Sequence, residues 1–247
     1  MGISVCMASY NGEKYIARQL HSILDQLAEG DEVIVVDDCS TDASLKVIES
    51  LGDARIQVHV NDRNRGEVYS FGRAILLARQ EVVFLSDQDD IWVPGRAALL
   101  QQRLLESGVS LVTSNFDWIT ADEQPIHIPY DGVDAKASHQ HVRNIADIFI
   151  GKTNYFGCGM AFRRDFARLI VPMPDYVESH DLWIALASNL VGSNLHIDDK
   201  TLLKRKHGNN ATSTVSTRSL YKKLRARWIF VLSLITLLGR RVRMMSA

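Results

Sequence analysis

Three groups of polar residues each follow a short apolar run, and two of these groups are acidic. The groups are Ser9-Tyr10-Asn11, Asp37-Asp38 and Asp87-Gln88-Asp89-Asp90. The last group places three carboxylates within four residues, and these repel one another unless a positive charge lies between them. Their hard oxygen atoms favour Mg²⁺ or Mn²⁺, which often bind through one or two carboxylates together with substrate phosphates. The group therefore predicts a divalent cation that carries a diphosphate, whereas Asp37-Asp38 alone is equally typical of a turn or a helix cap.

The segments around these groups predict an α/β fold. Strands are expected over residues 3–8, 32–36, 56–60 and 82–85, and helices over residues 13–27, 43–51 and 69–79. This alternation implies right-handed crossovers and a mostly parallel sheet that is flanked by helices. Ligands of such sheets bind beyond the carboxyl ends of the strands, so the three polar groups are expected to share one rim.

The second half of the chain is less regular. It predicts helices over residues 97–106 and 180–189, and short strands over residues 110–114, 157–162 and 195–197. The polar segment 122–136 contains two prolines and is expected to form a loop over one end of the sheet.

Several motifs, taken in order, resemble glycosyltransferase family 2. Ser9-Tyr10-Asn11-Gly12-Glu13-Lys14-Tyr15 is similar to the opening of that family, and so is the segment 35–42, although the family commonly has Gly in place of Cys39. Asp87-Gln88-Asp89 occupies the place of the family's Asp-X-Asp metal motif. The segment 84–92, Gly157-Cys158-Gly159-Met160, His180-Asp181-Leu182-Trp183 and His207-Gly208-Asn209-Asn210 resemble a bacterial subgroup that includes rhamnosyltransferases of surface polysaccharides. The match runs over roughly residues 3–210 and implies the Rossmann-like GT-A fold.

The resemblance implies a role for each matching residue. Ala8, Ser9, Tyr10 and Asp38 would hold the base and the ribose of a nucleotide sugar. Asn64, Arg65 and Gly66 would lie beside the nucleotide, with Arg65 reaching a phosphate. Asp89 would bind Mg²⁺ or Mn²⁺, Asp87 would contact this metal or the ribose, and His207 would approach the metal or the diphosphate.

Asp181 matches the general base of the family, and His180 is the second candidate for this role. An inverting sugar transferase needs a group that takes the proton of the acceptor hydroxyl as its oxygen attacks the anomeric carbon. The metal then stabilises the departing diphosphate. Without the resemblance, Asp181 would be interpreted as a carboxylate that the helix dipole favours at a helix N-terminus.

The implied function is inverting transfer of a sugar from a nucleoside-diphosphate donor to a saccharide or lipid-linked acceptor in bacterial surface polysaccharide synthesis. Rhamnose on a dTDP carrier is the first expectation for the donor. A sugar-phosphate nucleotidyltransferase is one alternative, but it predicts a Gly-rich basic signature that the segment 9–13 lacks. A non-catalytic nucleotide-sugar binding module is another, but it predicts loss of the metal or base carboxylates, which are all present.

Charge is distributed unevenly along the 247 residues, whose formal net charge is -1. Eight basic residues and no acidic residue occur from Arg218 onward, so the preceding body is acidic. This argues against nucleic acid as the partner, because a phosphate backbone favours a basic face. The three separated cysteines and the absence of a charged leader predict free thiols and a cytoplasmic location.

The end of the chain predicts an extension of different character. We expect a GT-A domain over residues 1–212 and a basic amphipathic extension over residues 213–247. Its apolar centre, Trp228 to Leu238, has eleven residues, whereas a membrane-spanning helix needs about 20. Basic residues flank this centre, so the extension is expected to lie on the inner face of the cytoplasmic membrane as a peripheral element. The alternatives are a helix that packs on the body and a mobile tail.

Overall fold

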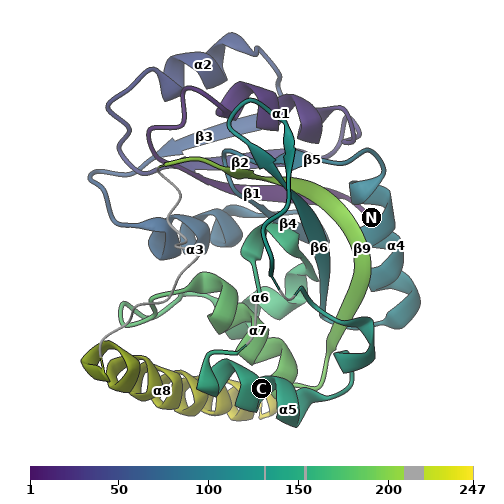
Figure 1. Ribbon diagram of the computed structural model, residues 1–247, viewed down its shortest axis with the longest axis vertical. Coiled ribbons are helices and arrows are strands. Elements are labelled where there is room, and N and C mark those ends of the chain that lie inside the picture. Colours follow the sequence, from purple (N-terminus) through teal and green to yellow (C-terminus); the bar gives the residue numbers. More distant parts are fainter. Residues whose placement is uncertain (131, 153–154, 209–219, 247) are drawn as a thin grey trace.

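The chain forms a curled sheet with helices on both faces (Figure 1). The computed structural model describes residues 1–130, 132–152, 155–208 and 220–246. In this part of the chain the sheet has nine strands, with the order β3-β2-β1-β4-β8-β6-β9-β5 and with β7 paired to β6. The predicted α/β fold, a sheet flanked by helices and followed by a basic helix, is confirmed.

The first four strands form the parallel half of the sheet. They are β1 (Ile3–Ser9), β2 (Glu32–Asp37), β3 (Ile56–Val60) and β4 (Val82–Ser86). The helices between them are α1 (Ile16–Leu24), α2 (Ser44–Ser50) and α3 (Glu67–Leu77). β2 and β4 are buried along their whole length, as expected for apolar strands covered on both faces. The predicted strands agree with these bounds to within one residue.

The later strands enlarge the sheet mainly through antiparallel pairs. They are β5 (Ile91–Trp92), β6 (Leu111–Thr120), β7 (Pro125–Ile126), β8 (Met160–Arg163) and β9 (Asn194–Lys206). The accompanying helices are α4 (Arg96–Ser107), α5 (His141–Ile150), α6 (Ala167–Ile170) and α7 (His180–Leu190). β8 runs antiparallel between β4 and β6, whereas β6 and β9 are parallel. β6 and β9 are much longer than predicted, because their polar residues interrupt the apolar pattern that marks a strand.

Two apolar cores lie on opposite faces of the sheet. Successive side chains of a strand point to opposite faces, so Val33 and Val35 of β2 belong to one core while Ile34 and Val36 belong to the other. The first core is closed by α1 and α4, and the second by α3, α6 and α7. Apolar cores cover both faces of the sheet. Polar groups are therefore presented at the rim, where the carboxyl ends of β1, β2 and β4 lie.

The helix α8 (Leu220–Met245) lies along one outer edge of the molecule, next to α6 and α7 (Figure 1). Leu237 is 1% exposed and belongs to the second core. The Tyr176 and Thr236 hydroxyls are 2.6 Å apart, and Arg240 Nη1 donates to the Leu169 carbonyl at 2.9 Å. One face of α8 therefore packs on the body, as one of the alternatives predicted. No helix in the described ranges is long and apolar enough to cross a membrane, and the predicted boundary at residues 212–213 falls outside them.

We expect Leu237→Ala to lower the free energy of unfolding by about 2–3 kcal/mol, because it removes buried methyl groups and leaves a cavity. Leu238→Ala is the matched control, since this neighbour is 42% exposed, and its effect should stay within about 0.5 kcal/mol. Urea denaturation followed by circular dichroism measures both changes. Equal, negligible effects of the two substitutions would show that α8 does not pack on the body in solution.

Candidate active site

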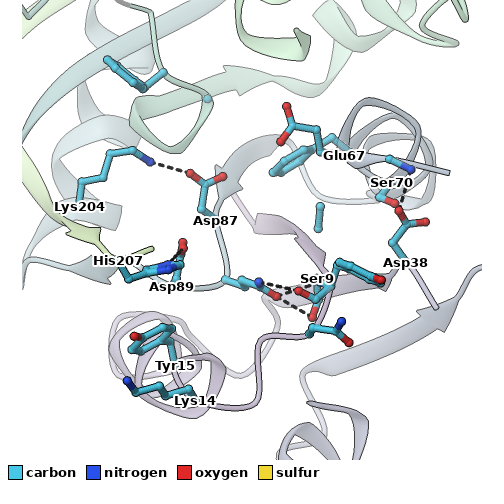
Figure 2. A pocket seen from close by; sticks show the side chains of 18 of the residues that line it. Ser9, Lys14, Tyr15, Asp38, Glu67, Ser70, Asp87, Asp89, Lys204 and His207 are labelled. Atoms are coloured by element: carbon cyan, nitrogen blue, oxygen red, sulfur yellow. Dashed lines mark hydrogen bonds and ion pairs between the residues drawn. The ribbon is translucent and has the colours of Figure 1, made fainter. Parts of the chain in front are cut away.

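A cavity of about 1030 Å³ opens at the carboxyl rim of β1, β2 and β4. Eleven of the twelve residues singled out from the sequence line it: Ala8, Ser9, Tyr10, Asp38, Asn64, Gly66, Asp87, Asp89, His180, Asp181 and His207. Asp38 and Ser70 lie on the opposite side of the cavity from Lys204 and His207 (Figure 2). The rim predicted from the strand ends is therefore one continuous site, although its residues span most of the chain.

Asp38, directly after β2, holds the loop before α3. Its Oδ1 accepts hydrogen bonds from the backbone N–H of Arg65 at 2.8 Å and from Asn61 Nδ2 at 2.7 Å, and its Oδ2 accepts from the Gly66 N–H at 2.7 Å. Gly66 has a φ of +85°, a conformation that strongly favours glycine. The side chain of Asp38 therefore fixes the loop that closes this side of the cavity.

Arg65 is the one predicted site residue that does not line the cavity. Its guanidinium pairs with Asp62 at 2.8 Å and lies over the Tyr69 ring, 4.6 Å from the centroid. Asp62, three residues earlier in the chain, is the acceptor that this guanidinium contacts. Arg65 thus contributes its backbone N–H to Asp38, and the predicted contact between its side chain and a phosphate has no counterpart in this arrangement.

Gln88 connects the end of β1 to the acidic segment after β4. Its Oε1 accepts from Ser9 Oγ at 3.0 Å and from the Tyr10 N–H at 2.9 Å, and its Nε2 donates to the Tyr10 carbonyl at 3.0 Å. A Cβ on Gly12 would lie 2.2 Å from Gln88 Oε1, so a larger residue there would have to displace the Gln88 amide. Sequence reasoning treated Gln88 as a spacer between two acids, and nothing in the local pattern reveals its contact with β1.

Lys204 of β9 occupies the centre of the acidic cluster. Its ammonium is buried and lies 2.8 Å from Asp87 Oδ2 (Figure 2). The same nitrogen lies 3.5 Å from Asp90 Oδ2. Burial opposes the charge on Lys204, but Asp87 and Asp90 raise its pKa well above the ordinary value. Burial likewise raises the pKa of Asp87, yet the Lys204 charge brings it below its ordinary value. Burial raises the pKa of Asp90 to about 7. One of the cations that the acidic cluster requires is thus a side chain of the protein itself.

Asp89 contacts His207 rather than Lys204. His207 Nε2 lies 2.6 Å from Asp89 Oδ2, and the His207 ring lies against Tyr15 with 4.9 Å between ring centroids. A carboxylate oxygen and an imidazole nitrogen that line one cavity fit Mg²⁺ or Mn²⁺, with ligand phosphates completing the coordination. Asp87, Asp90 and Cys158 also have ligand atoms within 4.8 Å of one another. The Lys204 ammonium contacts all three, so it takes the place a metal would need.

Asp181 and His180 stand at the start of α7, where Ser179 Oγ caps the helix by accepting from the Leu182 N–H at 3.2 Å. His180 Nε2 lies 2.6 Å from Asp181 Oδ1, and the His180 ring stacks on Phe71 at 4.1 Å. A Cβ on Gly157 would approach both atoms to less than 3 Å, so glycine admits the pair. The side chain of His180 is 5% exposed and that of Asp181 is 22% exposed, so the carboxylate is the more accessible group.

Glu67, the first residue of α3, is a lining residue that sequence reasoning missed. Its Oε1 lies 3.9 Å from His180 Nδ1, so His180 has a carboxylate on each side. Burial lowers the pKa of His180, but the charges of Asp181, Glu67 and Asp87 outweigh it and raise the pKa above 6.5. In the sequence, the one signal for Glu67 as a site residue is its position directly after Asn64-Arg65-Gly66.

Comparison with known proteins identifies the family. Residues 4–170 match the profile described as "Glycosyl transferase family 2". The putative teichuronic acid biosynthesis glycosyltransferase TuaG of Bacillus subtilis (strain 168) is 30% identical over 133 residues, which are 51% of this chain and 53% of that protein. The chain thus spans about half the length of this curated relative.

Two solved structures share the fold. S. aureus TarS 1-349 in complex with UDP-GlcNAc has a TM-score of 0.70 and 19% identity, covering 97% of this chain and 72% of TarS. Mannosyltransferase PcManGT from Pyrobaculum calidifontis, in complex with GDP-Man and Mn²⁺, has a TM-score of 0.62 and 17% identity, covering 99% of this chain and 75% of that one. These likenesses confirm the predicted GT-A fold. With the profile match over residues 4–170, they lead to one conclusion: the chain belongs to glycosyl transferase family 2.

Proposed function

We propose that this protein transfers a sugar, with inversion at the anomeric carbon, from a nucleoside-diphosphate donor to a saccharide or lipid-linked saccharide. The observation that carries the proposal is the single cavity that contains Asp38, the Asp89–His207 pair and Asp181. It provides a wall for a nucleotide, a place for a metal beside the diphosphate and a carboxylate for the acceptor. Membership of family 2 argues against the nucleotidyltransferase alternative.

The donor side is supported by the two related folds, one holding UDP-GlcNAc and the other GDP-Man. The donor that we propose is rhamnose on a dTDP carrier, on the resemblance of the segment 84–92 to bacterial rhamnosyltransferases. The process that we propose is surface polysaccharide synthesis at the inner face of the cytoplasmic membrane. The name of TuaG, a putative glycosyltransferase of teichuronic acid biosynthesis, supports that assignment.

Mg²⁺ or Mn²⁺ would be held by Asp89 and His207, and when bound it would neutralise the charge that develops on the leaving diphosphate. Asp87 would help indirectly, because its charge keeps the Lys204 ammonium in the cavity wall. Lys204 and Lys206 both line this side, so the diphosphate would lie against fixed positive charges as well.

Asp181 is the group that we propose as the general base. His180 is flanked by Asp181 and Glu67, which favour its protonated form, and an imidazolium has no free lone pair to accept a proton. The raised pKa widens the pH range over which His180 is protonated, and this disfavours the histidine as the base. Its contact engages Oδ1 of Asp181, so the other carboxylate oxygen is the one that would take the proton of the acceptor hydroxyl.

A panel of nucleoside-diphosphate sugars tests the proposal as a whole. We expect metal-dependent release of the nucleoside diphosphate from one donor, with dTDP-rhamnose preferred and release stimulated by saccharide acceptors. Liquid chromatography of the released nucleotide measures this. Failure of every donor, with and without acceptors, would contradict a transferase function.

Asp181→Asn should reduce kcat at least about a hundredfold, because general-base catalysis contributes about 10²- to 10⁴-fold. Affinity for the nucleoside diphosphate, measured by calorimetry, should change little, since Asn keeps the shape of the side chain. Glu67→Gln is the matched control on the other side of His180, with an expected loss of less than about tenfold. If Asp181→Asn turns over at the wild-type rate while His180→Asn does not, the histidine is the base.

Asp89→Asn and His207→Ala should each weaken Mn²⁺ binding in the presence of nucleoside diphosphate by about tenfold or more, because each removes a ligand. Asp87→Asn should weaken it less, since Lys204 already engages this carboxylate. Electron paramagnetic resonance of free Mn²⁺ measures the affinity without any turnover. Equal losses for Asp87 and Asp89 would assign the metal to both, and full activity in excess chelator would exclude a metal-dependent reaction.

A further inference from the structure

The outer side of α8 carries a continuous row of exposed apolar residues. Its members recur at alternating intervals of three and four residues, and we call them the outer stripe: Tyr221, Leu224, Trp228, Val231, Ile235, Leu238, Val242 and Met245. Residues at this spacing lie on one side of a helix. Trp228 is 64% exposed and Ile235 is 61% exposed. An apolar row of this length on a protein surface indicates an interaction site.

Packing on the body does not account for the outer stripe. The opposite side of α8 supplies the residues that contact the second core, Phe230, Leu234 and Leu237. A helix that only covers a core has one apolar side and a polar side toward water. α8 instead has two apolar sides, and folding uses only the inner one.

The neighbouring helix α5 contacts α8 and also exposes apolar residues. Phe149 contacts Phe230 with 5.2 Å between ring centroids, and Arg227 Nη2 donates to the Ile150 carbonyl at 2.7 Å. Phe149 and Ile150 are themselves exposed, at 38% and 53%. Exposed apolar residues of α5 therefore lie beside α8, next to its inner side.

The charges of α8 indicate what covers the outer stripe. The helix has seven basic residues and no acidic one, and the basic residues flank an uncharged centre, residues 228–239. Lys222, Lys223 and Arg225 at one end and Arg241 and Arg243 at the other are exposed. A basic helix with an apolar row and a tryptophan suits the surface of an anionic bilayer, where the charges reach the headgroups and the apolar side chains enter the acyl boundary.

We propose that the outer stripe docks on an anionic lipid bilayer, with α8 lying in the membrane plane. This deepens the proposed function by naming the surface that faces a lipid-linked acceptor, and it rests on that function only for the acceptor. α8 also contacts the catalytic helix, because the Arg240 guanidinium lies 5.4 Å from the Trp183 ring centroid and Arg241 Nη1 donates to the Leu190 carbonyl at 2.7 Å. Docking would thereby set the orientation of α7, whose first turn carries Asp181.

A second copy of the chain fits the outer stripe less well. The spacing of the stripe matches the apolar seam of a coiled coil, in which the flanking positions need opposite charges on the partner helix. α8 carries seven basic residues and no acidic one, so a second α8 offers no opposite charge for the flanking positions. An anionic lipid surface instead meets exposed basic residues such as Lys223 and Arg243.

The tryptophans provide a direct test. Trp92, Trp118 and Trp183 are at most 7% exposed, whereas Trp228 is 64% exposed. We expect the full chain to float with vesicles of phosphatidylcholine and phosphatidylglycerol, with a blue shift of tryptophan emission. Vesicles of phosphatidylcholine alone should bind it weakly, and 0.5 M salt should weaken the anionic binding about tenfold. Trp228→Phe should abolish the shift while leaving most of the flotation.

Matched variants locate the surface. Ile235→Glu should weaken binding to the anionic vesicles at least about tenfold, because it places a charge in the acyl boundary. Leu105→Glu on α4, where the residue is 52% exposed, is the control and should bind like the wild type. Equal binding by Ile235→Glu and the wild type, or no vesicle binding by the wild type, would overturn the proposal. So would sedimentation showing that the wild type is a dimer that Ile235→Glu converts to a monomer without vesicle binding.

The same proteins separate this proposal from the transferase proposal. Ile235→Glu should retain nucleoside-diphosphate affinity and turnover with a water-soluble acceptor, because α8 does not line the cavity in the described part of the chain. A wild type that binds anionic vesicles but uses no donor of the panel would refute the transferase and leave the docking surface standing.

Discussion

The ammonium of Lys204 lies among the carboxylates of Asp87 and Asp90 at the carboxyl edge of the sheet, and the shape of the rim depends on this contact. Parallel strands bring several acids to one edge, and burial makes their repulsion costly unless a cation balances it. Lys204 belongs to β9, and the long pairing of β9 with β6 places this residue near the end of β4. Removing one partner of such a buried pair typically costs about 3–5 kcal/mol, so the fold and the site are stabilised by the same interaction.

Because Lys204 balances Asp87, the second acid of the motif, Asp89, contacts a different partner. Asp89 lies two residues further along and faces His207, a residue from the end of β9 rather than from its buried part. The cavity thus combines a fixed positive charge with a place for a metal. Under the proposed function, the fixed charge orients the diphosphate in every state, whereas the metal arrives with the donor and leaves with the nucleotide.

The helix α7 connects the chemistry of this cavity to the outside of the molecule. Its first turn carries Asp181 at the cavity, and its middle is buried between the sheet and α8. Trp183, two residues after Asp181, contacts Arg240 of α8. Under the proposed function, this contact would link the proposed base to the surface that docks on the membrane.

The sequence by itself determined the parallel half of the sheet, because the apolar runs of β1, β2 and β4 are short, uninterrupted and followed by turns. It also determined that the polar groups after β1, β2 and β4 gather at the rim, since parallel topology places the carboxyl ends of these strands on one edge. Tertiary structure alone decided which of those residues contact one another. Lys204 meets Asp87, and His207 meets Asp89, across more than 110 residues of chain. No local pattern encodes these partners, because the register between β6 and β9, with its irregularity after Thr113, sets which side chains of β9 point into the cavity.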